Sequence, residues 1–173
     1  MNRRSAGAVI LLSAASLPAG SSAAATSGQQ GEYLYFLPEP DRTHAAAVAQ
    51  QLLVEFDTVP IDARRLAGVY QRSAPAMRNQ GSEAAFIERV SKYRAGLGAR
   101  RERVLQGVEG GFRFLPNLPD GQYAIVVFDT VFGPPSPAPL IYTEQLTLAR
   151  DPARGSSWEM VDYYLDLKPF YKY

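Results

Sequence analysis

The sequence contains no cysteine and a single histidine, His44. Without cysteine, the chain can form no disulfide bond, thiolate metal site or cysteine-linked lipid anchor. A histidine metal site needs two or three such ligands, and a serine–histidine–aspartate arrangement would have to use His44. No catalytic motif surrounds this residue, which lies among alanines. We therefore expect His44 to be exposed near the start of a helix, and we predict no metal site and no catalytic residue.

The sequence also has little net charge. Lys and Arg number 18 against 17 Asp and Glu, a formal charge of +1 at pH 7. Residues 1–25 hold two arginines and no acid, so the rest of the chain has 16 basic against 17 acidic residues. A chain so close to neutrality has no long-range field to attract nucleic acid. The stretch "GVEGGF" lacks the lysine and the strand–loop–helix setting of a phosphate-binding loop. We expect no nucleic-acid partner and no cofactor.

No apolar run is long enough to span a bilayer as a permanent helix. The N-terminus instead has the three-part layout of a secretory signal peptide: Arg3 and Arg4, the apolar "AGAVILLSAASLPAG", then the small residues "SSAAATS". We predict a signal peptide over residues 1–25, cleaved after Ala25 or one of the two alanines before it. The layout predicts a periplasmic or secreted protein with no integral membrane span after cleavage.

The remaining chain is predicted to have three parts. Residues 26–40 form a polar linker and a hydrophobic strap, "YLYFL", which Pro38 and Pro40 end. Residues 41–167 form a single α+β domain. Residues 168–173, "KPFYKY", form an aromatic tail.

Apolar residues recur at three- and four-residue spacing in three segments of the N-terminal half, which predicts three helices. Asp41 or Thr43 can cap the first, Asp62 the second and Ser82 the third. Gly98 suits the left-handed position after the third helix. The stretch "APAMRNQGS" between the second and third helices is predicted to be a turn.

After Gly98 the apolar period changes to two, which predicts four strands beginning at "RRERVLQGV", "GQYAIVVFDTVF", "LIYTEQLTLAR" and "WEMVDYYLDL". The second is apolar on both faces, so we place it inside the sheet. In the fourth, strict alternation puts Tyr163 and Leu165 on the face opposite Met160.

Three helices followed by four consecutive strands predict an α+β fold, in which three N-terminal helices pack on one face of a four-stranded antiparallel meander. Such a sheet can curve into a cone, as in folds similar to nuclear transport factor 2 and the cystatins. The strap or the tail could cover the other face of the second strand. An uncovered apolar face would instead mark a binding site.

The chain resembles an exported bacterial family known as domain-of-unknown-function family 4019, from Ala45 to Leu165. The resemblance rests on the order and spacing of "LAGVYQRSAPAM", "FIERVSKYRAGLGARRERVL", "DGQYAIVVFDTVF", "EQLTLAR" and "WEMVDYYL". Tyr70 stands where the family commonly has tryptophan, and "GPPSPAP" is longer and richer in proline. The resemblance implies an α+β domain in the cell envelope, and no catalytic residue, ligand or partner.

Glu144 is the most informative acid because it shares an apolar strand face with Tyr142 and Leu146. A buried carboxylate needs a partner or a raised pKa. The arginines at the start of the first strand, Arg100, Arg101 and Arg103, can supply that partner. We interpret Glu144 as half of a structural ion pair that fixes strand register.

An alternative interpretation makes Glu144 the floor of a pocket. Helices on a curved sheet could enclose a small hydrophobic or aromatic ligand among bulky side chains. The candidate binding residues are Tyr70, Tyr123, Phe128, Tyr142, Glu144 and Trp158. At the level of fold analogy alone, such pockets include isomerases that use an acid with a tyrosine.

The sequence therefore favours an exported, non-catalytic binding or assembly module with a partner in the cell envelope. The alternative is a small-molecule pocket protein, or an isomerase-like or hydrolase-like enzyme that uses Asp or Glu with Tyr.

Overall fold

The computed structural model describes residues 36–112, 115, 117–151 and 157–168. The predicted signal peptide, most of the linker and strap, and the last five residues of the tail lie outside these ranges. Within them the fold is α+β, with a four-stranded antiparallel sheet, as the sequence predicts. None of the helices in this part of the chain has the length and apolar character needed to cross a membrane.

The helices come first in the chain: α1 (Glu39–Phe56), α2 (Ala63–Gln71), α3 (Pro75–Gln80) and α4 (Glu83–Arg94). Asp62 caps α2 by accepting from the backbone N–H groups of Arg64 and Arg65, and Ser82 caps α4 through Ala85, both as predicted. The short helix α3 replaces the predicted turn. Pro75 is its first residue, where a missing N–H breaks no helical hydrogen bond.

Helix α1 begins earlier than its sequence indicates. It starts at Glu39 with Pro40 in its first turn, so Pro40 belongs to the helix rather than ending an element. No side chain caps this end. The carboxylate of Asp41, predicted as a cap, instead binds the guanidinium of Arg150 through two hydrogen bonds of 2.7 and 2.8 Å. This pair ties the start of α1 to the end of a strand.

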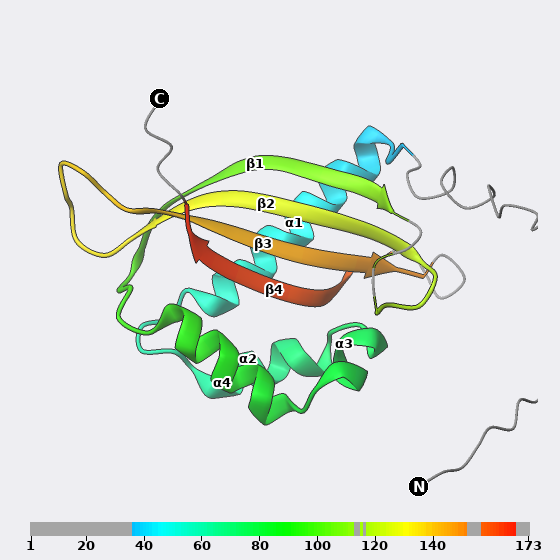
Figure 1. The fold of residues 1–173 in the computed structure, drawn as a ribbon, viewed down its shortest axis with the longest axis horizontal. Coiled ribbons are helices and arrows are strands. Elements are labelled where there is room, and N and C mark those ends of the chain that lie inside the picture. Colours follow the sequence, from blue (N-terminus) through cyan, green and yellow to red (C-terminus); the bar gives the residue numbers. More distant parts are fainter. Residues whose placement is uncertain (1–35, 113–114, 116, 152–156, 169–173) are drawn as a thin grey trace, which may run out of the picture.

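The strands β1 (Arg100–Phe112), β2 (Gln122–Phe132), β3 (Ile141–Arg150) and β4 (Glu159–Leu167) pair in chain order. Strand β2 therefore lies inside the sheet, as its two apolar faces predict. Helix α1 crosses the back of the sheet and contacts β1, β2 and β3, whereas α3 and α4 contact β4 (Figure 1). None of the four described helices covers the middle of the opposite face, although the start of α3 packs against one end of it.

The main core lies between the helices and one face of the sheet. From α1 it takes Ala45, Ala49, Leu53 and Phe56, each fully buried. From β2 it takes the alternating residues Ala124, Val126 and Phe128. The two alanines of α1 allow this helix to approach the sheet closely, while the larger side chains supply most of the buried apolar area.

A β-bulge in β4 overturns the strict alternation expected there. The register shifts between Thr147 and Leu148, so that Met160 pairs with Leu148 and Tyr163 with Leu146. Both Met160 and Tyr163 therefore face the main core, whereas the predicted pattern put them on opposite faces. Of the two residues between them, Val161 points the other way and joins a small second cluster.

Candidate functional site

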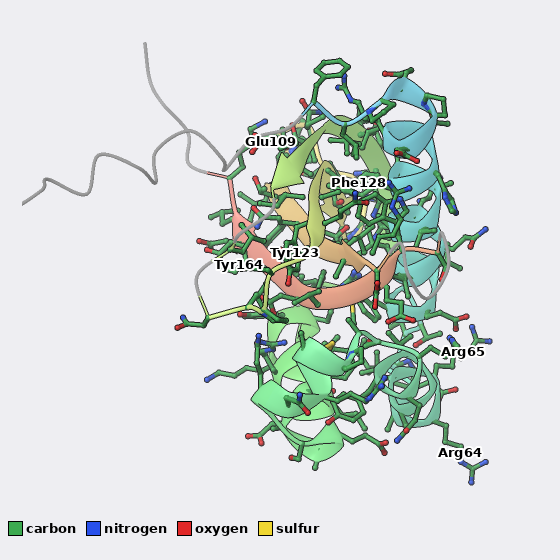
Figure 2. The ribbon with its side chains drawn as sticks, turned by 90° about the vertical axis from the view of Figure 1, so that its right-hand side faces the viewer. Arg64, Arg65, Glu109, Tyr123, Phe128 and Tyr164 are labelled. Carbon is green, nitrogen blue, oxygen red and sulfur yellow. The ribbon has the colours of Figure 1, made fainter. Side chains whose placement is uncertain are left out.

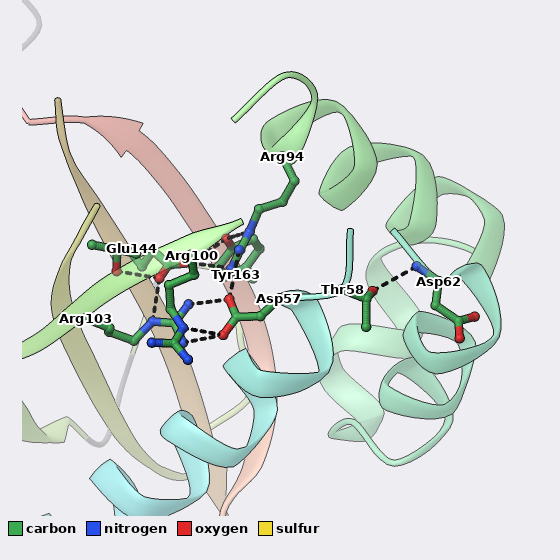
Figure 3. Close-up of polar contacts among 9 residues, drawn as sticks. Asp57, Thr58, Asp62, Arg94, Arg100, Arg103, Glu144 and Tyr163 are labelled. Carbon is green, nitrogen blue, oxygen red and sulfur yellow. Dashed lines mark hydrogen bonds and ion pairs between the residues drawn. The ribbon is translucent and has the colours of Figure 1, made fainter. Parts of the chain in front are cut away.

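Glu144 lies at the centre of a buried polar cluster. Its side chain is 0% exposed, and each of its two carboxylate oxygens accepts two hydrogen bonds (Figure 3). Oε1 accepts from Arg94 Nη2 at 2.5 Å and from the Tyr163 hydroxyl at 2.9 Å. Oε2 accepts from Arg103 Nε at 2.7 Å and from the Thr130 hydroxyl at 2.6 Å. The carboxylate is therefore fully paired in the interior.

A second acid, Asp57, completes the cluster from the C-terminal end of α1. Its oxygens accept from Arg103 at 2.8 and 2.9 Å, from Arg100 at 2.7 Å and from Arg94 at 3.1 Å. Arg94 and Arg103 each bind both acids, so these two guanidinium groups bridge Asp57 to Glu144 (Figure 3). The cluster joins α1, α4, β1, β3 and β4 at one end of the sheet.

The pKa values of Asp57 and of the Tyr163 hydroxyl are both displaced from their usual values. Burial raises the pKa of Asp57, but the hydrogen bonds and charge of Arg103, with Arg100 and Arg94, outweigh it, so its pKa is lowered overall. Burial and the neighbouring Glu144 raise the pKa of the Tyr163 hydroxyl well above its usual value. Tyr163 therefore stays protonated and donates to Glu144 while it accepts from Arg94 Nε.

The chemistry of this cluster is structural. All four hydrogen bonds to Glu144 come from the protein, and the side chains of Arg94 and Arg103 are each 5% exposed. A substrate would have to displace these partners to reach the carboxylate. The arrangement fits the interpretation of Glu144 as a structural ion-paired acid, with Arg103 as one of the partners considered. Arg101 donates instead to the carbonyl of Pro134.

The candidate pocket residues lie in several places. Phe128, Tyr142 and Glu144 are together on the core face of the sheet, where Phe128 pairs with Glu144 in register. Tyr70 is on α2 and donates to the Gly81 carbonyl at 2.6 Å. Trp158 lies beneath the guanidinium of Arg150, 4.8 Å from the ring centroid.

Tyr123 lies on the opposite side of the sheet from the other five. Its ring joins the second cluster with Val161 and Ala74, and its hydroxyl donates to the carbonyl of Pro119 at 2.5 Å. Three of the six candidates, Tyr70, Phe128 and Trp158, thus belong to the main core, and Tyr142 packs against it. Glu144 is buried on the same face of the sheet, whereas Tyr123 is not.

The uncovered face of the sheet, here called the outer face, is the second candidate site. Register places Val104, Ile125, Val127, Val131, Ile141 and Tyr164 on it. Val104 and Tyr164 are 46% and 43% exposed, and the other four are half-buried. Figure 2 shows Tyr164 and Glu109 on the side of the sheet away from α1, whereas Phe128 points towards that helix.

One end of the outer face is covered by the protein itself. Leu115 and Leu118 pack against the second cluster around Tyr123, together with the start of α3. The strap contributes nothing to this cover in its described part. Leu37 is buried in the main core against Gly110, and Phe36 is 82% exposed. The middle of the outer face, from Ile125 to Val131, is the apolar region left partly open.

A family model described as "Protein of unknown function (DUF4019)" matches residues 54–163. The chain belongs to this family. The match confirms the resemblance seen in the sequence. No curated protein and no solved structure matches the chain. The six residues of the buried polar cluster with charged or phenolic side chains all lie inside the DUF4019 region, as does most of the outer face.

Sequence reasoning missed three members of the DUF4019 domain's polar cluster. Arg94 looks like a solvent-exposed basic residue at a helix C-terminus, and Asp57 like the polar end of α1. Tyr163 looks like an ordinary large side chain of the hydrophobic core. The usable signal was an excess of basic residues: three arginines follow a helix closely, at 100, 101 and 103, with one acid, Glu102, among them.

No group of three or more His, Asp or Glu within the described ranges could hold a metal ion. His44 is exposed on α1, as expected from its setting.

Proposed function

We propose that this DUF4019 protein is exported and acts as a non-catalytic binding or assembly module, with the outer face of its sheet as the contact surface. One observation carries the proposal: an interior strand, β2, keeps Ile125, Val127 and Val131 only half-buried on the part of the outer face that no described helix covers. Exposed apolar patches of this kind mark protein contacts. The signal-peptide layout of residues 1–25 supports export.

The two candidate sites have different roles. The buried polar cluster already has its hydrogen bonds satisfied by the protein, so it serves stability. The outer face has apolar side chains whose burial would be favourable, at about 25 cal/mol for each Å² removed from water. Partner binding would bury this apolar surface.

The absence of cysteine makes a direct test possible. Tyr164→Cys places one thiol on the outer face, and Val54→Cys places one on α1 at a similar exposure, 43% against 52%. We expect both purified variants to react equally with a membrane-impermeant maleimide. In cells of the native host, after the outer barrier is permeabilised, Val54→Cys should react and Tyr164→Cys should be protected.

Equal labelling of both thiols in the cells would overturn the proposal that the outer face is a contact surface. Labelling of neither, with the protein found in the cytoplasmic fraction, would overturn export. Thermal melting of both variants serves as the folding control.

A further inference from the structure

Except for the buried Glu144, the described strand acids lie on the outer face of the sheet. The register places Glu102, Glu109, Asp129, Glu159, Asp162 and Asp166 there. Three of the strand arginines lie on the helix side, where Arg100 pairs with Phe132, Arg103 with Thr130 and Arg150 with Gln122. A nearly neutral protein thus has one acidic face.

The acids surround an apolar centre. Glu102 and Glu109 lie on the edge strand β1, and Glu159 and Asp166 on the opposite edge strand β4. Between them β2 and β3 carry the half-buried Ile125, Val127, Val131 and Ile141. The apolar strip therefore belongs mainly to β2, where Asp129 interrupts it, and β3 adds the uncharged polar residues Thr143, Gln145 and Thr147. Carboxylates lie along both margins of the face.

In the part of the chain that the structure describes, most of these carboxylates have no cation partner, although Arg89 of α4 binds Asp162 at 3.0 Å. Lys168 binds Asp129 at 2.5 Å. Within the described ranges, Glu102, Glu109, Glu159 and Asp166 have no ion-pair partner. Asp166 accepts from the hydroxyl of Tyr164 and from the backbone N–H of Leu167. Arg101, in the bulge at the start of β1, donates to Pro134.

Building on the proposed function, we infer that the partner of the outer face is a protein segment with an apolar centre flanked by lysine or arginine. Charge complementarity selects this occupant, because opposite charges across an interface favour encounter and register. A second copy would bring acidic margins against acidic margins. An anionic membrane would be repelled for the same reason. The ion pair between Lys168 and Asp129 is an example of the contact expected.

The test uses the purified protein from residue 26 onward and two synthetic strand-forming peptides. One has a central run of valines with lysines at both ends, and its counterpart has the same valines with glutamates at both ends. We expect the lysine peptide to bind at least about tenfold more tightly by fluorescence anisotropy, and its affinity to fall as salt rises. The triple variant Glu102→Gln, Glu109→Gln, Asp166→Asn should weaken binding about tenfold or more.

A matched triple variant, Glu39→Gln, Glu55→Gln, Glu88→Gln, changes the net charge equally but leaves the outer face intact. We expect its affinity for the lysine peptide to stay within about twofold of the original, because distant exposed charges are screened. Equal weakening by both triples would show a general charge effect and overturn the inference. Equal affinity for the two peptides would also overturn it.

Three other occupants give distinct results. If deletion of residues 169–173 is needed before the lysine peptide binds, the chain's own tail fills the face. A dimer in sedimentation that the outer-face triple dissociates would identify a second copy, and co-sedimentation with phosphatidylglycerol vesicles a membrane; each result would overturn the inference. The thiol-protection experiment separates the two proposals. If Tyr164→Cys is protected in cells, and adding the outer-face triple leaves that protection unchanged, only the inference of a cationic partner is contradicted.

Discussion

Glu144 is the residue at which a single substitution should destabilise the protein most. It is fully buried and accepts from two arginines and two hydroxyl groups. In Glu144→Gln, an amide NH₂ replaces an acceptor oxygen, and Asp57 alone faces three arginines. Removal of one partner from a buried ion pair costs about 3–5 kcal/mol. We expect a loss of about 3 kcal/mol or more in the free energy of unfolding, measured by urea denaturation.

Glu109→Gln is the matched control for that experiment. It makes the same chemical change in the same sheet, but at an exposed position of the outer face. We expect its stability to stay within about 0.5 kcal/mol of the wild type. Similar losses in the two variants would mean that the buried cluster contributes no special stabilisation.

Asp57 should make stability depend on pH at the acid end. Its pKa is lowered in the folded protein from an ordinary value of 3.8. A lowered pKa means that its stabilising contribution is complete above about pH 4, and is lost as pH falls towards the folded-state pKa. Asp57→Asn removes that proton linkage. As the pH is lowered from about 5 to about 2, we expect the urea midpoint to fall less steeply in Asp57→Asn than in wild type.

Equal slopes for the two proteins would contradict the role of Asp57 in this pH range. Asp41, whose pKa the hydrogen bond from Arg150 lowers, supplies a comparison. Its carboxylate lies at the other end of α1, so Asp41→Asn tests whether the effect belongs to the buried cluster.

At the scale of elements, β1 needs glycine at one position and not at another. A Cβ atom at Gly110 would lie 2.4 Å from Leu37 Cδ2 and 2.9 Å from Leu37 Cβ, whereas at Gly107 it would meet nothing within 4 Å. Overpacking of a core typically costs about 1–3 kcal/mol. We expect Gly110→Ala to lower the free energy of unfolding in this range, and Gly107→Ala to change it by less than about 0.5 kcal/mol.

The double variant Gly110→Ala with Leu37→Ala identifies the contact. If the two residues clash, the double variant should lose less stability than the sum of the single losses. Additive losses would place the cause elsewhere in β1.

The elements also show which parts of the fold a sequence can predict. Alternating apolar residues located all four strands, and Asp62 and Ser82 located two helix starts, because these signals are local. The bulge at β4 was missed because one extra residue leaves the composition of the strand unchanged. The burial of Glu144 followed from its apolar neighbours. Its contact with Arg94, 50 residues away in the chain, leaves no local pattern.

At the scale of the whole molecule, the proposed export predicts a defined mature chain. If a signal peptidase cleaves after Ala25, intact-mass measurement of protein from the native host should give a chain that begins at Thr26. A basic residue at position 23 should hinder cleavage, because the peptidase requires small side chains there. Retention of Met1 in protein from the envelope fraction would contradict the prediction.

The bridging of Asp57 and Glu144 by shared arginines also has a consequence for the order of folding. Asp57 directly follows α1 and Arg94 ends α4, whereas the strands contain Arg103, Glu144 and Tyr163. Neither half alone can satisfy these charges in an apolar interior, so a half-folded species is disfavoured and unfolding should be a single transition. A chain threading a membrane pore N-terminus first would have its halves on opposite sides. Neither half could then fold stably, and the polypeptide would stay extended until β4 had followed the helices across.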